Sequence, residues 1–222
     1  MSGTELVDAH VHALGRRLRG PGRARRDLLD EVRAGLLDAV DARREAGADP
    51  QAAQREALAE FGTPGELAPA YQATLVAAQG RRTAMLLALA FPGLVVGWDV
   101  MWTAGVKWSS APSPGVRRLS QVEDALSLGV GGAALVVLLV LVRCARRGGD
   151  PRRAAQVVGV VGAAGALLCA GVAVGMNVAA GPVGGLPRSD WSTAVPAYGA
   201  SVVVLVLVLR SVTRTLRLAY RR

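Results

Sequence analysis

The sequence changes character near Arg82. Before this point, charged and apolar residues alternate as they do in a water-soluble helical protein, and after it come four long apolar runs. The runs cover about residues 83–106, 125–142, 154–180 and 191–209 and hold 18 to 27 residues each. Roughly 20 helical residues, rising about 1.5 Å each, cross a hydrocarbon core of about 30 Å. The runs therefore predict four transmembrane helices.

This pattern predicts an all-α protein with two parts. Residues 1–80 are expected to form a cytosolic domain of three to four short helices, and residues 81–222 a four-helix transmembrane bundle. The hydrophobic share of 51% is concentrated in the second part. A multi-pass protein of the plasma membrane, in contact with membrane lipid, is the expected class.

The net charge of +9 is divided unevenly. Residues 1–80 hold 10 Arg against 12 Asp and Glu, whereas residues 81–222 hold 16 Lys and Arg against 5 acids. A domain that grips DNA through phosphates needs a basic face, so we expect no direct nucleic-acid binding. The arginines cluster before the first run, between the second and third, and after the fourth. Because short loops rich in Lys and Arg stay in the cytoplasm, both termini are predicted to be cytoplasmic.

Tryptophans agree with this orientation. They stand at or near the ends of the runs that would face outward, where amphipathic rings prefer the membrane interface. The residues are Trp98, Trp102, Trp108 and Trp191.

The first part of the chain carries clear helix signals. Apolar residues at helical spacing predict helices over about 4–18 and 23–46, separated by the sequence Gly-Pro-Gly at 20–22. Each helix has one apolar stripe, which predicts a shared core.

Two further helices begin with a capping residue and a proline. Asp49 is the expected N-cap of a third helix with Pro50 in its first position, and Gly62 ends that helix. Thr63 and Pro64 repeat the arrangement for a fourth helix.

The fourth helix has an apolar face formed by Leu67, Tyr71 and Leu75. It either continues through Gln79 and Gly80 into the first transmembrane run or breaks there at a hinge. The sequence leaves both alternatives open.

The order of these elements resembles the HAAS signalling domain, also described as a permease prefix domain. The resemblance covers about residues 4–75 and is carried by Asp49-Pro50, Ala53, Ala57 and the run Phe61-Gly62-Thr63-Pro64-Gly65-Glu66-Leu67-Ala68. It implies a cytosolic interaction module ahead of membrane helices in bacteria, working beside a PadR-type transcriptional regulator or within a transporter system. It implies no catalytic residues. The candidate protein-interaction residues are Asp49, Pro50, Phe61, Gly62, Pro64 and Leu67.

No catalytic, metal-binding or cofactor-binding pattern is found in the sequence. His10 and His12 would point about 200° apart on a helix, so they cannot hold one metal ion. Cys144 and Cys169 stand alone, outside any Cys/His cluster. We therefore expect a protein that is not an enzyme and needs no cofactor.

Asp99 is the one acid within the predicted first span. A charge at mid-bilayer costs roughly 2.5 to 3.5 kcal/mol on insertion scales, so such residues are functional candidates. Its depth, about 25 Å from Arg82 at about 1.5 Å per residue, places it near the outer interface. A ligand or ion role and an interfacial or helix-pairing role both remain open.

The third run contains small residues suited to close helix packing. Gly171 and Gly175 form a GxxxG pattern, and Gly159, Gly162 and Gly165 extend it. Packing within the bundle and packing between two copies, as a homo-oligomer, are both open.

Three functions remain. The first is a signalling or regulatory membrane protein whose cytosolic helices bind a protein partner such as a PadR-type transcription factor. The second is an accessory subunit of a transporter or ABC permease system, which Asp99 would also suit. A membrane enzyme ranks last, because no nucleophile and base pair is found. Arginine outnumbers lysine 25 to 1, which points to a high-GC bacterium.

Overall fold

The structure, a computed structural model, describes residues 5–103, 114–147, 151–180 and 191–220, which form seven α-helices. The all-helical prediction is confirmed. The chain divides into two units, Met1–Gln79 and Gly80–Arg222, and each has a hydrophobic core of its own. Trp108 lies outside the described residues, as do residues 104–113 around it and residues 181–190 between the third and fourth apolar runs.

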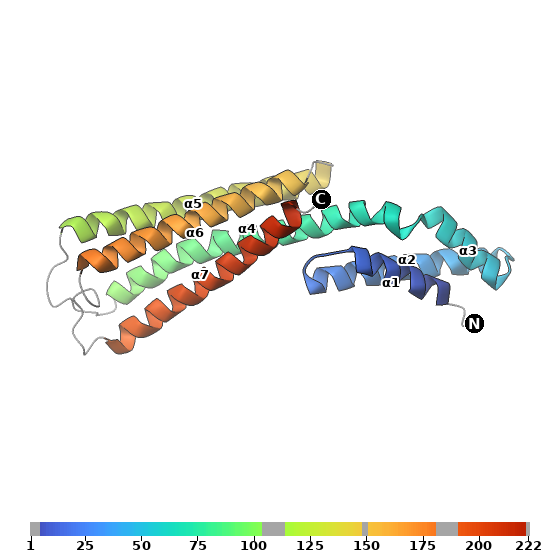
Figure 1. The fold of residues 1–222 in the computed structure, drawn as a ribbon, viewed down its shortest axis with the longest axis horizontal. Coiled ribbons are helices and arrows are strands. Elements are labelled where there is room, and N and C mark those ends of the chain that lie inside the picture. Colours follow the sequence, from blue (N-terminus) through green and yellow to red (C-terminus); the bar gives the residue numbers. More distant parts are fainter. Residues whose placement is uncertain (1–4, 104–113, 148–150, 181–190, 221–222) are drawn as a thin grey trace. The chain divides into compact units, whose positions relative to one another are not determined.

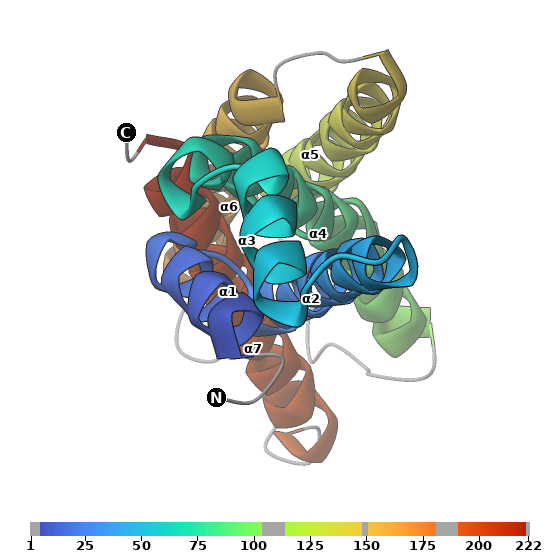
Figure 2. The same cartoon turned by 90° about the vertical axis from the view of Figure 1, so that its right-hand side faces the viewer.

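The first unit contains α1 (Glu5–Arg17), α2 (Gly22–Glu45), α3 (Pro50–Phe61) and the first turns of α4 (Pro64–Thr103). The bounds of α1 and α2 lie within one residue of those predicted from the apolar spacing. α2 packs against both α1 and α3 (Figure 2). The predicted apolar stripes form the core, which consists of Val7, Leu14, Leu18, Leu28, Val32, Leu36, Val40, Ala53, Ala57 and Leu75.

Gln79 and Gly80, where the sequence left a continuous helix and a hinge open, both lie inside the helix α4. Gly80 serves close packing instead of a turn. A Cβ at this position would lie 3.2 Å from the Cβ of Ala155, closer than most real contacts of that kind. A residue without a side chain therefore lets α4 and α6 (Pro151–Ala180) approach each other here.

The second unit is a bundle of α4, α5 (Pro114–Arg147), α6 and α7 (Trp191–Tyr220) (Figure 1). α6 packs against both α5 and α7. By length and composition, four helices could cross a membrane: Pro64–Val100, Pro114–Arg143, Arg152–Gly175 and Val195–Tyr220. α5 begins at Pro114, well before the apolar run that starts near residue 125. Glu123, expected in a connection between spans, therefore lies within a helix.

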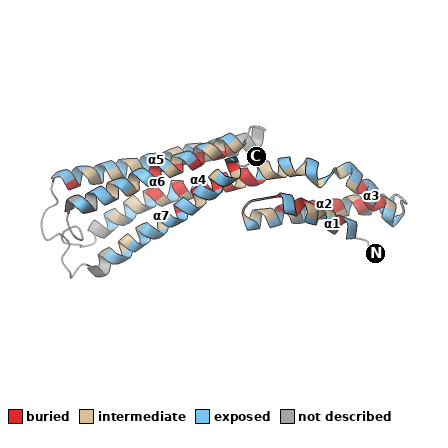
Figure 3. Cartoon of the chain, in the orientation of Figure 1, coloured by how far each residue is buried: buried red, intermediate tan, exposed pale blue. Residues whose placement is uncertain are grey.

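The two units expose different surfaces. Large hydrophobic side chains that are exposed within the described residues lie on α4 to α7, with Leu6 in the first unit as the exception. Leu167 and Val178, for example, are 69% and 79% exposed. In Figure 3, buried positions of the bundle face between its helices and exposed positions lie on their outer faces. Outward apolar faces of this kind suit lipid and would be costly in water.

Candidate functional site

The predicted interaction residues Asp49 and Pro50 start α3. The carboxylate of Asp49 accepts hydrogen bonds from the backbone N–H groups of Gln51, at 3.0 Å, and Ala52, at 3.2 Å. Pro50 occupies the first helical position, where its missing N–H needs no partner. Both residues thus have a structural role as a helix start. Contact with a partner at these exposed positions stays a prediction.

Phe61, Gly62 and Leu67 form the link between α3 and α4. Phe61 and Leu67 pack against the core of the first unit. Gly62 has a φ of +94°, a left-handed conformation that side chains other than glycine rarely adopt. These three candidates therefore have structural roles in the connection between α3 and α4. The resemblance to the HAAS domain rests largely on residues that determine the conformation of this connection.

The start of α4 is held by a capping box. The Thr63 backbone N–H donates to a carboxylate oxygen of Glu66 at 2.8 Å, and the Glu66 N–H donates to Thr63 Oγ1 at 3.3 Å. This reciprocal pair satisfies two backbone donors that the first helical turn leaves without partners. The turn at Thr63, Pro64 and Gly65 is fixed as a result.

A groove of about 480 Å³ lies beside this fixed turn. One wall is the turn itself, which includes the predicted interaction residue Pro64. The other is the C-terminal half of α1, with Ala13, Arg16 and Arg17. The sequence did not single out the two arginines, since nothing in the local pattern places the end of α1 next to residue 64.

Several other arginines of the first unit are held in ion pairs. Arg33 contacts Asp8 at 2.7 Å, and Arg44 contacts Asp41 at 3.4 Å. Arg43 pairs with Glu60 and Glu56. Within the described residues, no ion pair involves Arg16 or Arg17, and both are exposed. Their charges face the groove rather than a neighbouring acid.

His10 is a buried polar group of a different kind. Its ring lies edge-on to Phe61, with ring centroids 6.4 Å apart. Its buried Nε2 atom has no hydrogen-bond partner within the described residues. Burial lowers the pKa of His10 below its ordinary value of 6.5, because desolvation disfavours the charged imidazolium. Protonation of His10 at low pH therefore destabilises the core of the first unit.

In the second unit, Asp99 lies on an exposed face of α4 and takes no part in the lining of the cavity described next. The ligand or ion role left open for it stays a prediction. The interfacial role is not tested.

Gly171 and Gly175 do not pack within the bundle. Both are exposed, and a Cβ at either position would meet nothing within 4 Å. Within the described residues these two glycines make no close contact with another helix, and packing between two copies stays a prediction. The close contacts involve Gly159, Gly162 and Gly165, where a Cβ would lie 2.4 to 2.8 Å from side chains of other helices.

A cavity of about 780 Å³ opens among the four long helices. Figure 1 shows α7 separating from α5 and α6 toward its Trp191 end. The walls are almost entirely apolar and come from all four helices, and they include Phe91, Leu94, Ala166, Cys169, Ala170, Ala173, Val174, Tyr198, Val202, Val204 and Leu205.

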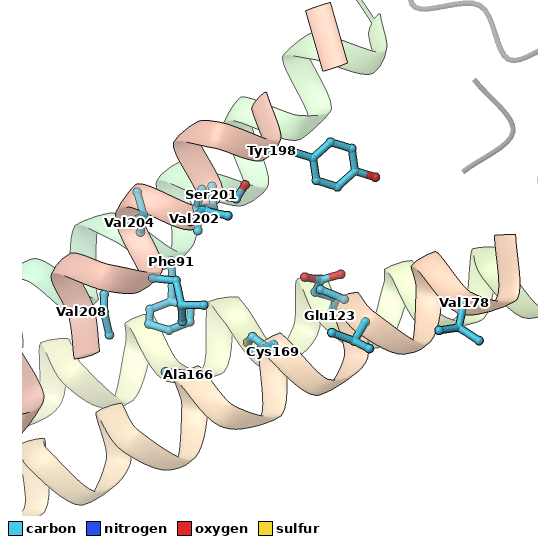
Figure 4. A pocket seen from close by; sticks show the side chains of 15 residues that line it. Phe91, Glu123, Ala166, Cys169, Val178, Tyr198, Ser201, Val202, Val204 and Val208 are labelled. Atoms are coloured by element: carbon cyan, nitrogen blue, oxygen red, sulfur yellow. The ribbon is translucent and has the colours of Figure 1, made fainter. Parts of the chain in front are cut away.

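Among the described residues, Glu123 is the one carboxylate that lines this cavity. In Figure 4 its carboxylate points from α5 into the space beneath α7, and Tyr198 extends into the same space from α7. Glu123 did not stand out in the sequence because the apolar run that predicts this helix begins near residue 125. Pro114, a residue favoured in the first turn of a helix, is the signal that could have placed Glu123 inside it.

Aromatic and hydroxyl groups join α4 to α7 next to the cavity. Trp98 Nε1 donates to Ser201 Oγ at 3.1 Å, and Ser201 Oγ donates to the carbonyl of Ala197 at 3.0 Å. The rings of Trp98 and Tyr198 lie edge-on, 5.0 Å apart. These contacts fix the Tyr198 ring beside the opening.

Comparisons with known proteins bear on the first unit. No curated protein and no solved structure matches the chain. The family model HAAS matches residues 11–70, which contain most of α1, all of α2 and α3, and the beginning of α4. The chain therefore carries a HAAS domain at residues 11–70, followed by four helices that could span a membrane.

Proposed function

We propose that this chain is a bacterial integral membrane protein of signalling or regulation, whose HAAS domain binds a protein partner in the cytoplasm. The observation that carries the proposal is the groove between α1 and the turn at Thr63 to Gly65. It is open to solvent, it is bordered by two exposed arginines, and its shape is fixed by the capping box.

The groove suits a partner that presents acidic side chains. Charged groups at the rim of an interface steer partners together and select among them. Arg16 and Arg17 also stand in the last turn of α1, where cations stabilise the helix dipole. Stabilising the helix dipole would not require a groove next to the two arginines. Because the arginines and the groove occur together, we favour a role in binding a partner.

The proposed partner is a PadR-type transcription factor held at the membrane. The association of HAAS domains with such regulators supports this choice. The domain itself has 10 Arg against 12 acids in residues 1–80, which disfavours direct binding to DNA.

The cytoplasmic placement of the domain rests on charge. Arginines precede the first apolar run at 83–106, crowd the connection between the second and third runs, and follow the fourth run at 191–209. The positive-inside rule then puts both termini in the cytoplasm. Fusions of green fluorescent protein and of alkaline phosphatase to the C-terminus test the orientation. We expect fluorescence with the first and no phosphatase activity with the second, and the reverse result would overturn this topology.

A bacterial two-hybrid assay tests the partner. The full chain is paired with a PadR-type regulator encoded in the same genome. We expect the double variant Arg16→Ala/Arg17→Ala to weaken the interaction about ten-fold, equivalent to about 1.4 kcal/mol. The matched control is Arg23→Ala/Arg26→Ala, which removes the same charge from exposed positions of α2 outside the groove. Equal signals from the two double variants, or no interaction with the regulator, would contradict the proposal.

A second candidate is an accessory subunit of a transporter or ABC permease system. The cavity among α4 to α7 favours it, because a ligand space between membrane helices is a feature of transport systems. Purification of the full chain from native membranes in mild detergent separates the two functions. An ATPase subunit retained at fixed stoichiometry would favour the transporter function. The absence of such a subunit would favour the signalling or regulatory function.

A further inference from the structure

The cavity of the second unit has the size and composition of a small-molecule site. Ligand pockets typically enclose about 300 to 1,000 Å³ and combine apolar walls with a few placed polar groups. This cavity measures about 780 Å³ and is walled by aliphatic and aromatic side chains. The space therefore suits a ligand with a bulky apolar body.

Glu123 gives the cavity a charge. Its carboxylate points into the space, and within the described residues no hydrogen bond or ion pair joins it to a cation. A carboxylate among apolar walls is unfavourable unless a partner offsets its lost hydration. Because the described residues supply no such partner, a positively charged ligand would supply the charge that offsets this carboxylate.

The aromatic groups beside the opening of the cavity also favour a positively charged ligand. The face of an aromatic ring attracts cations, and Tyr198 extends into the cavity opposite Glu123 (Figure 4). Trp98 holds that ring in place through the edge-on contact at 5.0 Å. An anion of equal size would gain the same apolar contacts but would be repelled by Glu123.

We infer that this cavity binds an amphiphilic cation, a molecule with one positive charge on an apolar body, with Glu123 as the anionic anchor. The apolar walls contact the body of the ligand, and the carboxylate of Glu123 and the ring of Tyr198 contact its charge. This binding site goes beyond the proposed function and does not depend on the partner of the HAAS domain.

The test measures saturable binding of tetraphenylphosphonium to the full chain in nanodiscs of uncharged lipid, with empty nanodiscs subtracted. We expect saturable binding to the wild type, weakened about 10- to 100-fold by Glu123→Gln, the range expected when a charged partner is lost. The matched control is Asp124→Asn, which removes the same charge from the next residue. Asp124 is exposed and does not line the cavity, so binding should stay unchanged.

Two further arms keep the inference falsifiable if Glu123→Gln does not fold. Tetraphenylborate has the same shape with the opposite charge, and we expect it, assayed alone, to show no saturable binding to the wild type above empty nanodiscs. Ala170→Phe places a ring in the cavity while leaving Glu123 in place, and we expect it to abolish binding.

Four outcomes would overturn the inference. They are no saturable binding to the wild type, equal binding by Glu123→Gln and Asp124→Asn, saturable binding of tetraphenylborate with the same affinity, and unchanged binding in Ala170→Phe. Native mass spectrometry provides one more test. If it finds a neutral lipid retained by the protein that tetraphenylphosphonium does not displace, the cavity is an acyl-chain site and the inference is overturned.

Discussion

The hydroxyl oxygens of Thr83 in α4 and Thr215 in α7 lie 2.8 Å apart, and both side chains are buried. Ser211 joins them, with its Oγ atom 2.6 Å from Thr83 Oγ1. Thr215 Oγ1 in turn donates to the Ser211 carbonyl at 3.0 Å. Where lipid replaces water, apolar contact alone gives helices little reason to associate, and such hydrogen bonds help to hold them together. This cluster therefore fixes α4 against α7.

Replacing Thr83 by valine keeps the shape of the side chain and removes its hydroxyl. We expect Thr83→Val to lower the free energy of unfolding by about 0.6 kcal/mol, the average for such bonds between membrane helices. Thr215→Val should behave similarly, and the double variant should lose less than the sum because both changes break one bond. Unfolding by sodium dodecyl sulfate in mixed micelles measures all three.

Thr213→Val is the control for this cluster. Thr213 is exposed, and its hydroxyl donates to carbonyls of its own helix, including that of Leu209 at 2.8 Å. We expect no loss of stability from this change. Strictly additive losses in the Thr83/Thr215 double variant would show that the two hydroxyls do not interact.

Gly165 provides a second prediction. A Cβ at this position would lie 2.4 Å from Cγ2 of Val130, so alanine forces α5 and α6 apart or Val130 out of its rotamer. We expect Gly165→Ala to destabilise the bundle by about 1 to 3 kcal/mol, as overpacking usually does. Gly171→Ala adds the same methyl group in open space and should be neutral or slightly stabilising. Equal effects of the two substitutions in the same unfolding assay would refute the assigned packing.

These glycines show where sequence reasoning succeeds and where it stops. The spacing of small residues marks α6 as a packing helix, and this is what the structure contains at Gly159, Gly162 and Gly165. The GxxxG pattern alone selects Gly171 and Gly175, which face open space. The spacing of small residues identifies which positions would let another helix approach closely. Which of these positions contact a helix depends on where the neighbouring helices lie.

Glu123 and Arg16 show the same limit for the candidate sites. Capping residues such as Asp49 and Gly62 act within one turn of a helix, so the sequence placed α3 correctly. The cavity around Glu123 combines side chains from four helices, and the groove at Arg16 combines α1 with a turn some 45 residues later. Such sites depend on tertiary packing, which no local pattern records.

Asp49 offers a direct test of the start of α3. Asp49→Ala removes the acceptor for the N–H groups of Gln51 and Ala52. We expect a loss of about 1 kcal/mol, typical of an N-cap, in the stability of the first unit. Hydrogen exchange of the α3 amides in the full chain measures it. Asp49→Asn keeps an acceptor oxygen and should recover most of the protection, and failure to do so would assign the effect to charge instead of capping.

His10 makes the first unit sensitive to acid. Its folded pKa is lowered by burial, whereas the unfolded chain titrates near the ordinary value of 6.5. Above this pH the ring is neutral in both states and has no effect on the pH dependence. As the pH falls below 6.5, the unfolded state takes up the proton first, so stability decreases until the folded pKa is passed and then levels off.

Hydrogen exchange of the α1 amides in the full chain measures this loss of stability. The exchange rates, corrected for the intrinsic rate, are compared at about pH 7.5 and about pH 5.5, on either side of the pH range in which histidine titrates. We expect His10→Leu to remove most of the pH dependence, because a neutral side chain then contacts Phe61 at both pH values. His12→Leu changes the exposed histidine two residues further along α1 and should leave the dependence intact. If His10→Leu loses protection at low pH as the wild type does, another group must carry the acid sensitivity of this domain.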